Sequence, residues 1–122
     1  MYCTRTDVER RWGAVNVSKW ADLDNDQNAG KIQAQIDWAI QTVEDRLDFD
    51  LASSGYYIPF APVPSIVVCT AAALVGALLY NARAINLSVD QINPNIKGVE
   101  EAYQNWLTSV YSGTPITGAR RV

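Results

Sequence analysis

An almost unbroken apolar segment occupies residues 66–80, and no charged residue occurs between Asp50 and Arg83. A helix of this composition is apolar on every side, so it must be buried on every side, either inside a helical bundle or in a membrane. A membrane span needs about 20 apolar residues, and this run is shorter and rich in alanine. We therefore predict a central core helix over residues 65–87. A small single-span or membrane-associated helical protein is the alternative.

Two other segments carry apolar residues along one helical face. The first covers residues 29–51 and is closed by Gly55. The second begins at Asn93 and Pro94, with proline in the first helical position, and is stopped by Gly113. The predicted buried stripes are Ile32, Ile36, Ile40, Val43, Leu47 and Leu51 in the first segment, and Ile96, Val99, Tyr103, Trp106 and Val110 in the second.

Shorter helices are predicted near the N-terminus. Thr6 and Glu9 have the spacing of a capping box, which predicts a helix that buries Val8 and Trp12 before Gly13. A second short helical turn follows, with Ser18 as its cap, and residues 88–91 have the form of another capping box. These segments predict an all-α protein, a compact bundle of about four helices spanning residues 1–113.

Two segments do not fit a helix. Three prolines at positions 59, 62 and 64 force residues 56–64 into an extended loop, whose aromatic side chains must pack on the core or on a neighbour. Residues 114–122 contain Pro115 and Gly118 and have no periodicity, which predicts a flexible C-terminal arm.

The absence of histidine is the strongest constraint on chemistry. It removes Ser-His-Asp and Cys-His nucleophilic centres, histidine-ligated metals and imidazole acid–base catalysis. The acidic pairs, such as Asp45 with Asp48, fall on the polar faces of helices, and no glycine-rich phosphate loop is present. We therefore expect a non-enzymatic protein without a cofactor.

The spacing Asp22-x-Asp24-x-Asp26 is similar to the start of a calcium loop. The pattern then fails, because Gln27 replaces the turning glycine and Gln33 replaces the closing glutamate. A solvated loop that caps the following helix is the preferred interpretation, and no metal site is predicted.

Charge, cysteine spacing and aromatic residues indicate which kinds of site and partner to expect. The net charge is -3 and the isoelectric point is near 4.7, which argues against a dedicated nucleic-acid binder. Cys3 and Cys69 have no metal-site spacing, so free thiols are preferred over a single long-range disulfide. Trp38, Tyr56 and Tyr57 are candidate contact residues, since aromatic side chains often anchor protein interfaces.

Three features together resemble the head–tail adaptor (connector or head-completion) proteins of tailed bacteriophages, most closely the Mu-like branch. They are the opening residues 1–4 with Trp12-Gly13, the aspartate loop before a long amphipathic helix, and residues 55–64 leading into an alanine-rich helix. The resemblance covers roughly residues 1–85.

This resemblance implies a structural virion protein of the neck, assembled in the cytoplasm of the bacterial host. Copies would form a ring, commonly twelve-fold, beneath the portal protein. The ring would extend the DNA channel and present a surface to the next neck or tail-completion protein. DNA would pass through without specific binding, and no membrane would be involved. Another phage interaction module on the same helical bundle is the remaining alternative.

The resemblance also suggests roles for particular residues. The C-terminal segment would dock on the portal, through Thr114, Pro115, Ile116, Arg120, Arg121 and Val122. Contact with a neighbouring subunit or with the next ring is expected from Tyr56, Tyr57, Pro59, Phe60 and Trp38. Acidic residues of the long helix would line the DNA channel, namely Asp37, Glu44, Asp45 and Asp48.

Overall fold

The computed structural model describes residues 1–87 and 94–122. In these residues five helices and no strand are found, which confirms the predicted all-α class. The helices are α1 (Arg5–Trp12), α2 (Ala14–Ala21), α3 (Ala29–Asp50), α4 (Ser65–Leu87) and α5 (Pro94–Tyr111). The capping box predicted at residues 88–91 lies outside the described residues.

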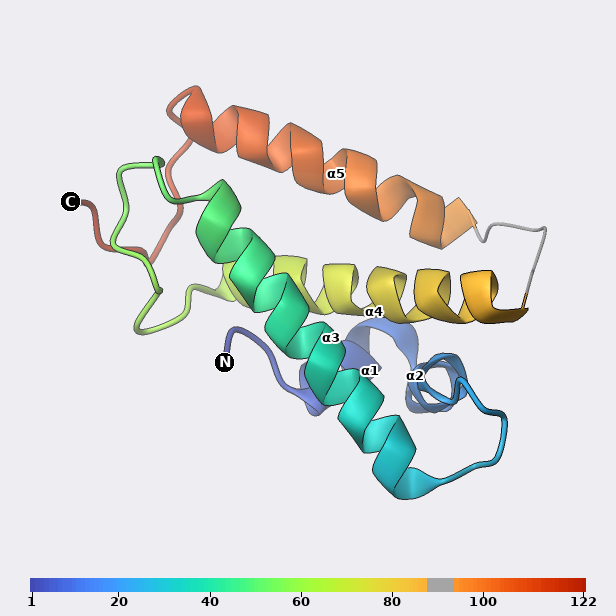
Figure 1. Ribbon diagram of the computed structural model, residues 1–122. Helices are drawn as coiled ribbons and strands as arrows, with labels where there is room; N and C mark the ends of the chain where they lie inside the picture. Colours follow the sequence, from blue (N-terminus) through green and yellow to red (C-terminus); the bar gives the residue numbers. More distant parts are fainter. Residues whose placement is uncertain (88–93) are drawn as a thin grey trace.

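The apolar helix α4 is the centre of the bundle (Figure 1). It contacts all four of the other helices, with α3 on one side, α1 and α2 on another, and α5 on a third. Its residues Val67, Ala71, Val75 and Leu79 are fully or almost fully buried. By length and composition alone, the stretch 65–83 of this helix could cross a membrane. Its position among four packed helices confirms the predicted central place of this helix, but Ile66 is 43% exposed and Cys69 is exposed, so the helix is not buried on every side.

The first helix begins two residues earlier than the sequence pattern predicts. Thr4, not Thr6, is the N-cap: its hydroxyl accepts the N–H of Asp7, and the Asp7 carboxylate accepts the N–H of Thr4 at 2.8 Å. Val8 and Trp12 are buried, as predicted. Ser18 is not a cap but lies inside α2, which starts directly after Gly13. The φ angle of Gly13 is +93°, a conformation that side-chain-bearing residues rarely adopt, so one glycine both ends α1 and starts α2.

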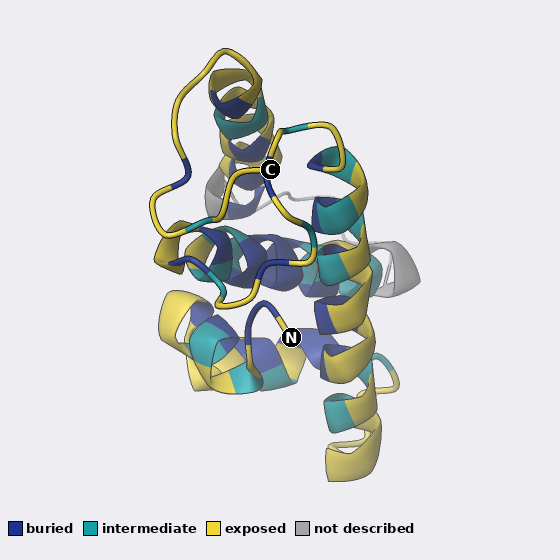
Figure 2. Ribbon diagram, turned by 90° about the vertical axis from the view of Figure 1, so that its left-hand side faces the viewer, coloured by how far each residue is buried: buried dark blue, intermediate teal, exposed yellow. Residues whose placement is uncertain are grey.

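The long helix α3 is close to its predicted length. Asn28 caps its start by accepting the N–H of Lys31 at 3.1 Å, and Leu51 caps its end. Ile36, Ile40, Val43 and Leu47 are buried as predicted, and the opposite side of the helix is exposed (Figure 2).

The last helix, α5, lies across α4 and is bonded to α3. Arg46 of α3 forms an ion pair with Glu100, which lowers the pKa of that carboxyl. The Tyr103 hydroxyl donates to Asp50 at 2.6 Å. Four residues of the predicted stripe are buried, and Trp106 is half-buried. After α5 the chain turns at Gly113, whose φ angle is +112°.

A close contact in the core joins α1 to α4. The Trp12 indole lies directly over Gly76, and its Nε1–H donates to the Ala72 carbonyl at 3.2 Å. Three aromatic rings pack edge to face in a row. The ring centres of Trp12 and Trp20 are 5.6 Å apart, and those of Trp20 and Tyr80 are 5.4 Å apart. This row holds α1 and α2 against the central helix.

Candidate docking surface

The proline-rich loop and the C-terminal segment lie side by side at one end of the molecule (Figure 1). We call residues 56–64 and 114–122 together the loop–arm end. Tyr57 N–H donates to the Arg120 carbonyl at 2.8 Å, and Val122 N–H donates to the Gly55 carbonyl at 2.8 Å. These bonds form an antiparallel bridge between Tyr56 and Arg121. The last residues therefore run as an extended partner of the loop.

The arm is also fixed by a buried side chain. Ile116 is 3% exposed, and its N–H donates to the Tyr56 hydroxyl at 2.8 Å. The segment predicted from the sequence as a flexible arm is bonded along the loop in the structure, and its Ile116 side chain is buried in the core. Its other predicted docking residues are exposed, namely Thr114, Pro115, Arg120, Arg121 and Val122.

Two of the predicted contact residues are buried inside the subunit. Tyr56 and Phe60 are each 5% exposed. The Phe60 ring packs 5.6 Å from the Tyr2 ring, and its N–H donates to the Tyr2 hydroxyl at 2.9 Å. Tyr57 is 52% exposed, and Pro59 is exposed beside it. The exposed part of the loop is therefore smaller than predicted.

The cations of the arm lie over the aromatic rings of the loop. The Arg120 guanidinium is 5.3 Å from the Tyr57 ring centre, and that of Arg121 is 5.2 Å from the Tyr56 ring centre. Both arginines are exposed, so their N–H groups can still bind carboxylates of a partner in bidentate pairs. A hollow of about 240 Å³ opens between Arg120 and the cis-proline turns at Pro59 and Pro62.

The four acidic residues predicted to line a DNA channel lie in two different environments. Glu44 accepts the N–H of Tyr2 at 2.6 Å, and Asp48 accepts the Tyr2 hydroxyl. Burial and the contact with Asp48 raise the pKa of Tyr2 above its ordinary value. Glu44 and Asp48 therefore hold the N-terminal segment and are partly buried. Asp37 and Asp45 are exposed on the outer side of α3.

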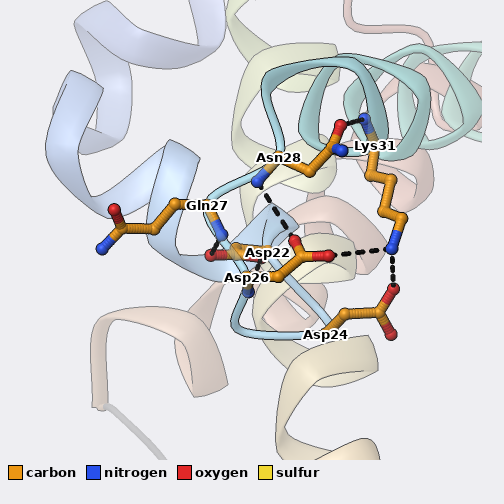
Figure 3. Close-up of polar contacts among 6 residues, drawn as sticks. All are labelled: Asp22, Asp24, Asp26, Gln27, Asn28 and Lys31. Carbon is orange, nitrogen blue, oxygen red and sulfur yellow. Dashed lines mark hydrogen bonds and ion pairs between the residues drawn. The ribbon is translucent and has the colours of Figure 1, made fainter.

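The aspartate loop between α2 and α3 is closed by its own residues (Figure 3). Asp22 is 8% exposed and accepts the backbone N–H groups of Asp26 and Gln27, at 3.2 and 3.0 Å. The Lys31 ammonium binds Asp24 at 3.1 Å and Asp26 at 2.8 Å, which lowers the pKa of Asp26 and raises that of Lys31. In the part of the chain that the structure describes, no group of three metal-ligating side chains is present. The carboxylates stabilise the entry into α3.

The two cysteines are free thiols in different surroundings. Cys69 is exposed on α4, whereas Cys3 is 3% exposed. Burial, together with Asp7 and Glu44, raises the pKa of the Cys3 thiol to about 12.

This difference predicts selective thiol modification. Since the thiolate is the reactive form, an aromatic disulfide reagent at pH 8 is expected to modify Cys69 in the folded chain and to modify Cys3 only after denaturation. Absorbance of the released thiolate measures this. The variant Cys69→Ser is the control and should give no fast reaction when folded. Fast modification of Cys3 in that variant would contradict the described burial.

The outer side of α3 carries two exposed aromatic rings. Trp38, a predicted contact residue, is 46% exposed, and Phe49 is 83% exposed. Sequence analysis overlooked Phe49, although its position eleven residues after Trp38 places both on one side of a helix.

Comparison with known families finds one match over nearly the whole chain. Residues 2–120 match the family model described as bacteriophage Mu, Gp36. Searches of curated proteins and of solved structures give no significant match. The family match confirms the Mu-like phage origin that the sequence predicts. The chain therefore belongs to the bacteriophage Mu Gp36 family and is a structural or morphogenesis protein of a phage.

Proposed function

We propose that this protein is a head–tail adaptor of the virion neck. Copies form a ring, commonly twelve-fold in such assemblies, beneath the portal protein. The ring extends the DNA channel and presents a surface to the next neck or tail-completion protein. The role is mechanical and needs no cofactor. Support comes from membership of a Mu-like phage family together with the sequence resemblance described above.

The observation that carries the proposal is the construction of the loop–arm end. It lies at one end of the bundle, is held rigidly by backbone hydrogen bonds, and exposes Tyr57, Arg120 and Arg121 together. Arginine and tyrosine are the side chains that most often dominate binding energy at protein interfaces. A preorganised surface also loses little conformational entropy on docking. These properties suit a portal-docking surface with acidic acceptors on the portal.

The proposal predicts that reversing the two arginine charges abolishes portal binding. The variant Arg120→Glu/Arg121→Glu is expected to lose co-sedimentation with the portal ring of the same phage, with affinity lowered at least about 100-fold, because two bidentate pairs become repulsive. Quantitative gels of the pelleted complex measure the bound fraction. Both side chains are exposed, so the fold should be retained.

Lys97→Glu is the control, since Lys97 is exposed on α5, outside the loop–arm end. It should bind the portal like the unmodified chain. Failure of the unmodified chain to bind would contradict the adaptor function. Full binding by the arginine variant would keep the function and exclude the loop–arm end as its docking surface.

A further inference from the structure

The outer side of α3 forms a face of exposed residues. We define the α3 face by the exposed residues Asp37, Trp38, Gln41, Asp45 and Phe49. At 100° per residue they fall within one arc of the helix, opposite the buried stripe through Ile36 and Leu47. The two aromatic residues are separated by about 16 Å along the helix axis. The face is thus apolar at Trp38 and Phe49, with Asp45 between them and Asp37 next to Trp38.

Its acidic residues are bonded to side-chain amides of the same helix. Asp37 and Asp45 each accept an amide hydrogen bond from a glutamine of α3, Gln33 and Gln41, at 2.8 and 2.9 Å. Among the residues that the structure describes, neither takes part in an ion pair. Aromatic side chains are enriched at protein interfaces relative to the rest of a protein surface, and two of them are exposed on this face.

The opposite side of the molecule carries the complementary chemistry. We define the α1–α2 face by Arg10, Val15 and Lys19, all exposed, with Val15 81% exposed. Within the described part of the chain, its two cations form no ion pair. Figure 2 shows α3 along one edge of the molecule, with the exposed sides of α1 and α2 along the other. The two faces therefore cannot meet within one subunit.

We propose that the α3 face of one copy docks on the α1–α2 face of the next copy. Carboxylates then meet guanidinium and ammonium groups, and one of the two aromatic side chains meets Val15. Contact between two α3 faces is disfavoured, because it would bring Asp37 and Asp45 against the same carboxylates of the partner. A contact between two different faces of the same chain repeats head to tail, and it closes into a ring when the rotation allows. This inference rests on the proposed adaptor function and identifies the contact that builds its ring.

The inference gives Asp37 and Asp45 a role different from the one predicted from the sequence. In the sequence interpretation they face a DNA channel. In this assembly they lie between subunits, so the channel is lined by other parts of the chain.

Charge reversal with complementation tests the contact. The acidic-face variant is Asp37→Lys/Asp45→Lys, and the basic-face variant is Arg10→Glu/Lys19→Glu. The full chain is treated with a carbodiimide, which joins lysine amines to carboxylates that are in contact, and is analysed on denaturing gels. We expect the unmodified chain to give a ladder of multimers that weakens at high salt. Each variant alone is expected to lose the ladder.

An equimolar mixture of the two variants should recover the ladder, because each reversed face then meets a face of opposite sign. The matched control is Lys97→Glu/Glu101→Lys, which exchanges charges on the exposed side of α5 and should keep the ladder. Circular dichroism verifies that all variants are folded. No ladder from the unmodified chain, or no recovery in the mixture, overturns the proposal.

Portal co-sedimentation separates this inference from the function on which it rests. An unmodified chain that gives a ladder but does not bind the portal contradicts the adaptor function alone. Portal binding by the unmodified chain together with failed complementation contradicts only the assignment of the two faces.

Discussion

Replacing Gly76 by alanine is expected to lower the free energy of unfolding by about 3 kcal/mol, because the new methyl group has no space. An ideal Cβ at position 76 would lie 2.0 Å from Nε1 and 2.1 Å from Cδ1 of the Trp12 indole. The indole cannot move aside without losing its hydrogen bond to Ala72 and its contact with Trp20. Urea unfolding followed by tryptophan fluorescence measures the change.

Gly98→Ala is the matched control, since Gly98 also lies inside a helix and has open space around its Cα. This substitution is expected to raise the free energy of unfolding by about 0.5–1 kcal/mol, through helix propensity and reduced freedom of the unfolded chain. The two alanine variants should thus change stability in opposite directions. Equal stability of the Gly76 variant and the unmodified chain would contradict the described packing of Trp12.

Ile116→Asp is expected to release the C-terminal segment while leaving the helices folded. Burying a carboxylate in the site of Ile116 costs more free energy than the few contacts of the segment supply. The segment is therefore expected to detach while the core stays closed. Amide hydrogen exchange at Ile116, Val122 and Tyr57 is expected to accelerate on the order of 100-fold, because these N–H groups lose their acceptors. Mass spectrometry of the peptides measures this.

Thr117→Asp is the control for this experiment, because Thr117 is the next residue and is exposed. It adds the same charge without disturbing the buried site, so exchange should stay slow. If the Ile116 variant exchanged no faster than the control, the segment would not be anchored by that side chain. General acceleration across α3 and α4 would show instead that residues 114–122 are part of the core.

The three long helices can be predicted because the pattern of apolar residues within each segment is enough to identify it. Apolar residues at helical spacing locate α3 and α5, and the all-round apolar composition of α4 places it at the centre. The start of α1 was mistaken because two capping boxes overlap. Thr6 with Glu9 fits the usual pattern better, yet the structure uses Thr4 with Asp7. Local rules alone cannot choose between them, since the choice depends on how α1 packs against α4.

The loop–arm end could be located from the sequence, but its construction could not. Ile116 and Tyr56 are 60 residues apart in the sequence. A contact over such a distance leaves no periodic pattern in either segment. The same holds for Phe60, whose N–H is bonded to Tyr2 from the other end of the chain. An aromatic residue beside proline has the same appearance in a sequence whether it faces a partner or the core. Only the distant side chains decide which is true.

The position of the loop–arm end would give a head-to-tail ring of this subunit a polarity. The two faces proposed to join neighbouring copies are on the sides of the molecule formed by α3 and by α1 with α2, and the loop–arm end belongs to neither. Rotation about a single axis orients every copy identically with respect to that axis. All loop–arm ends would therefore lie on the same side of the ring. Such a ring could fit between two different structures in one orientation only.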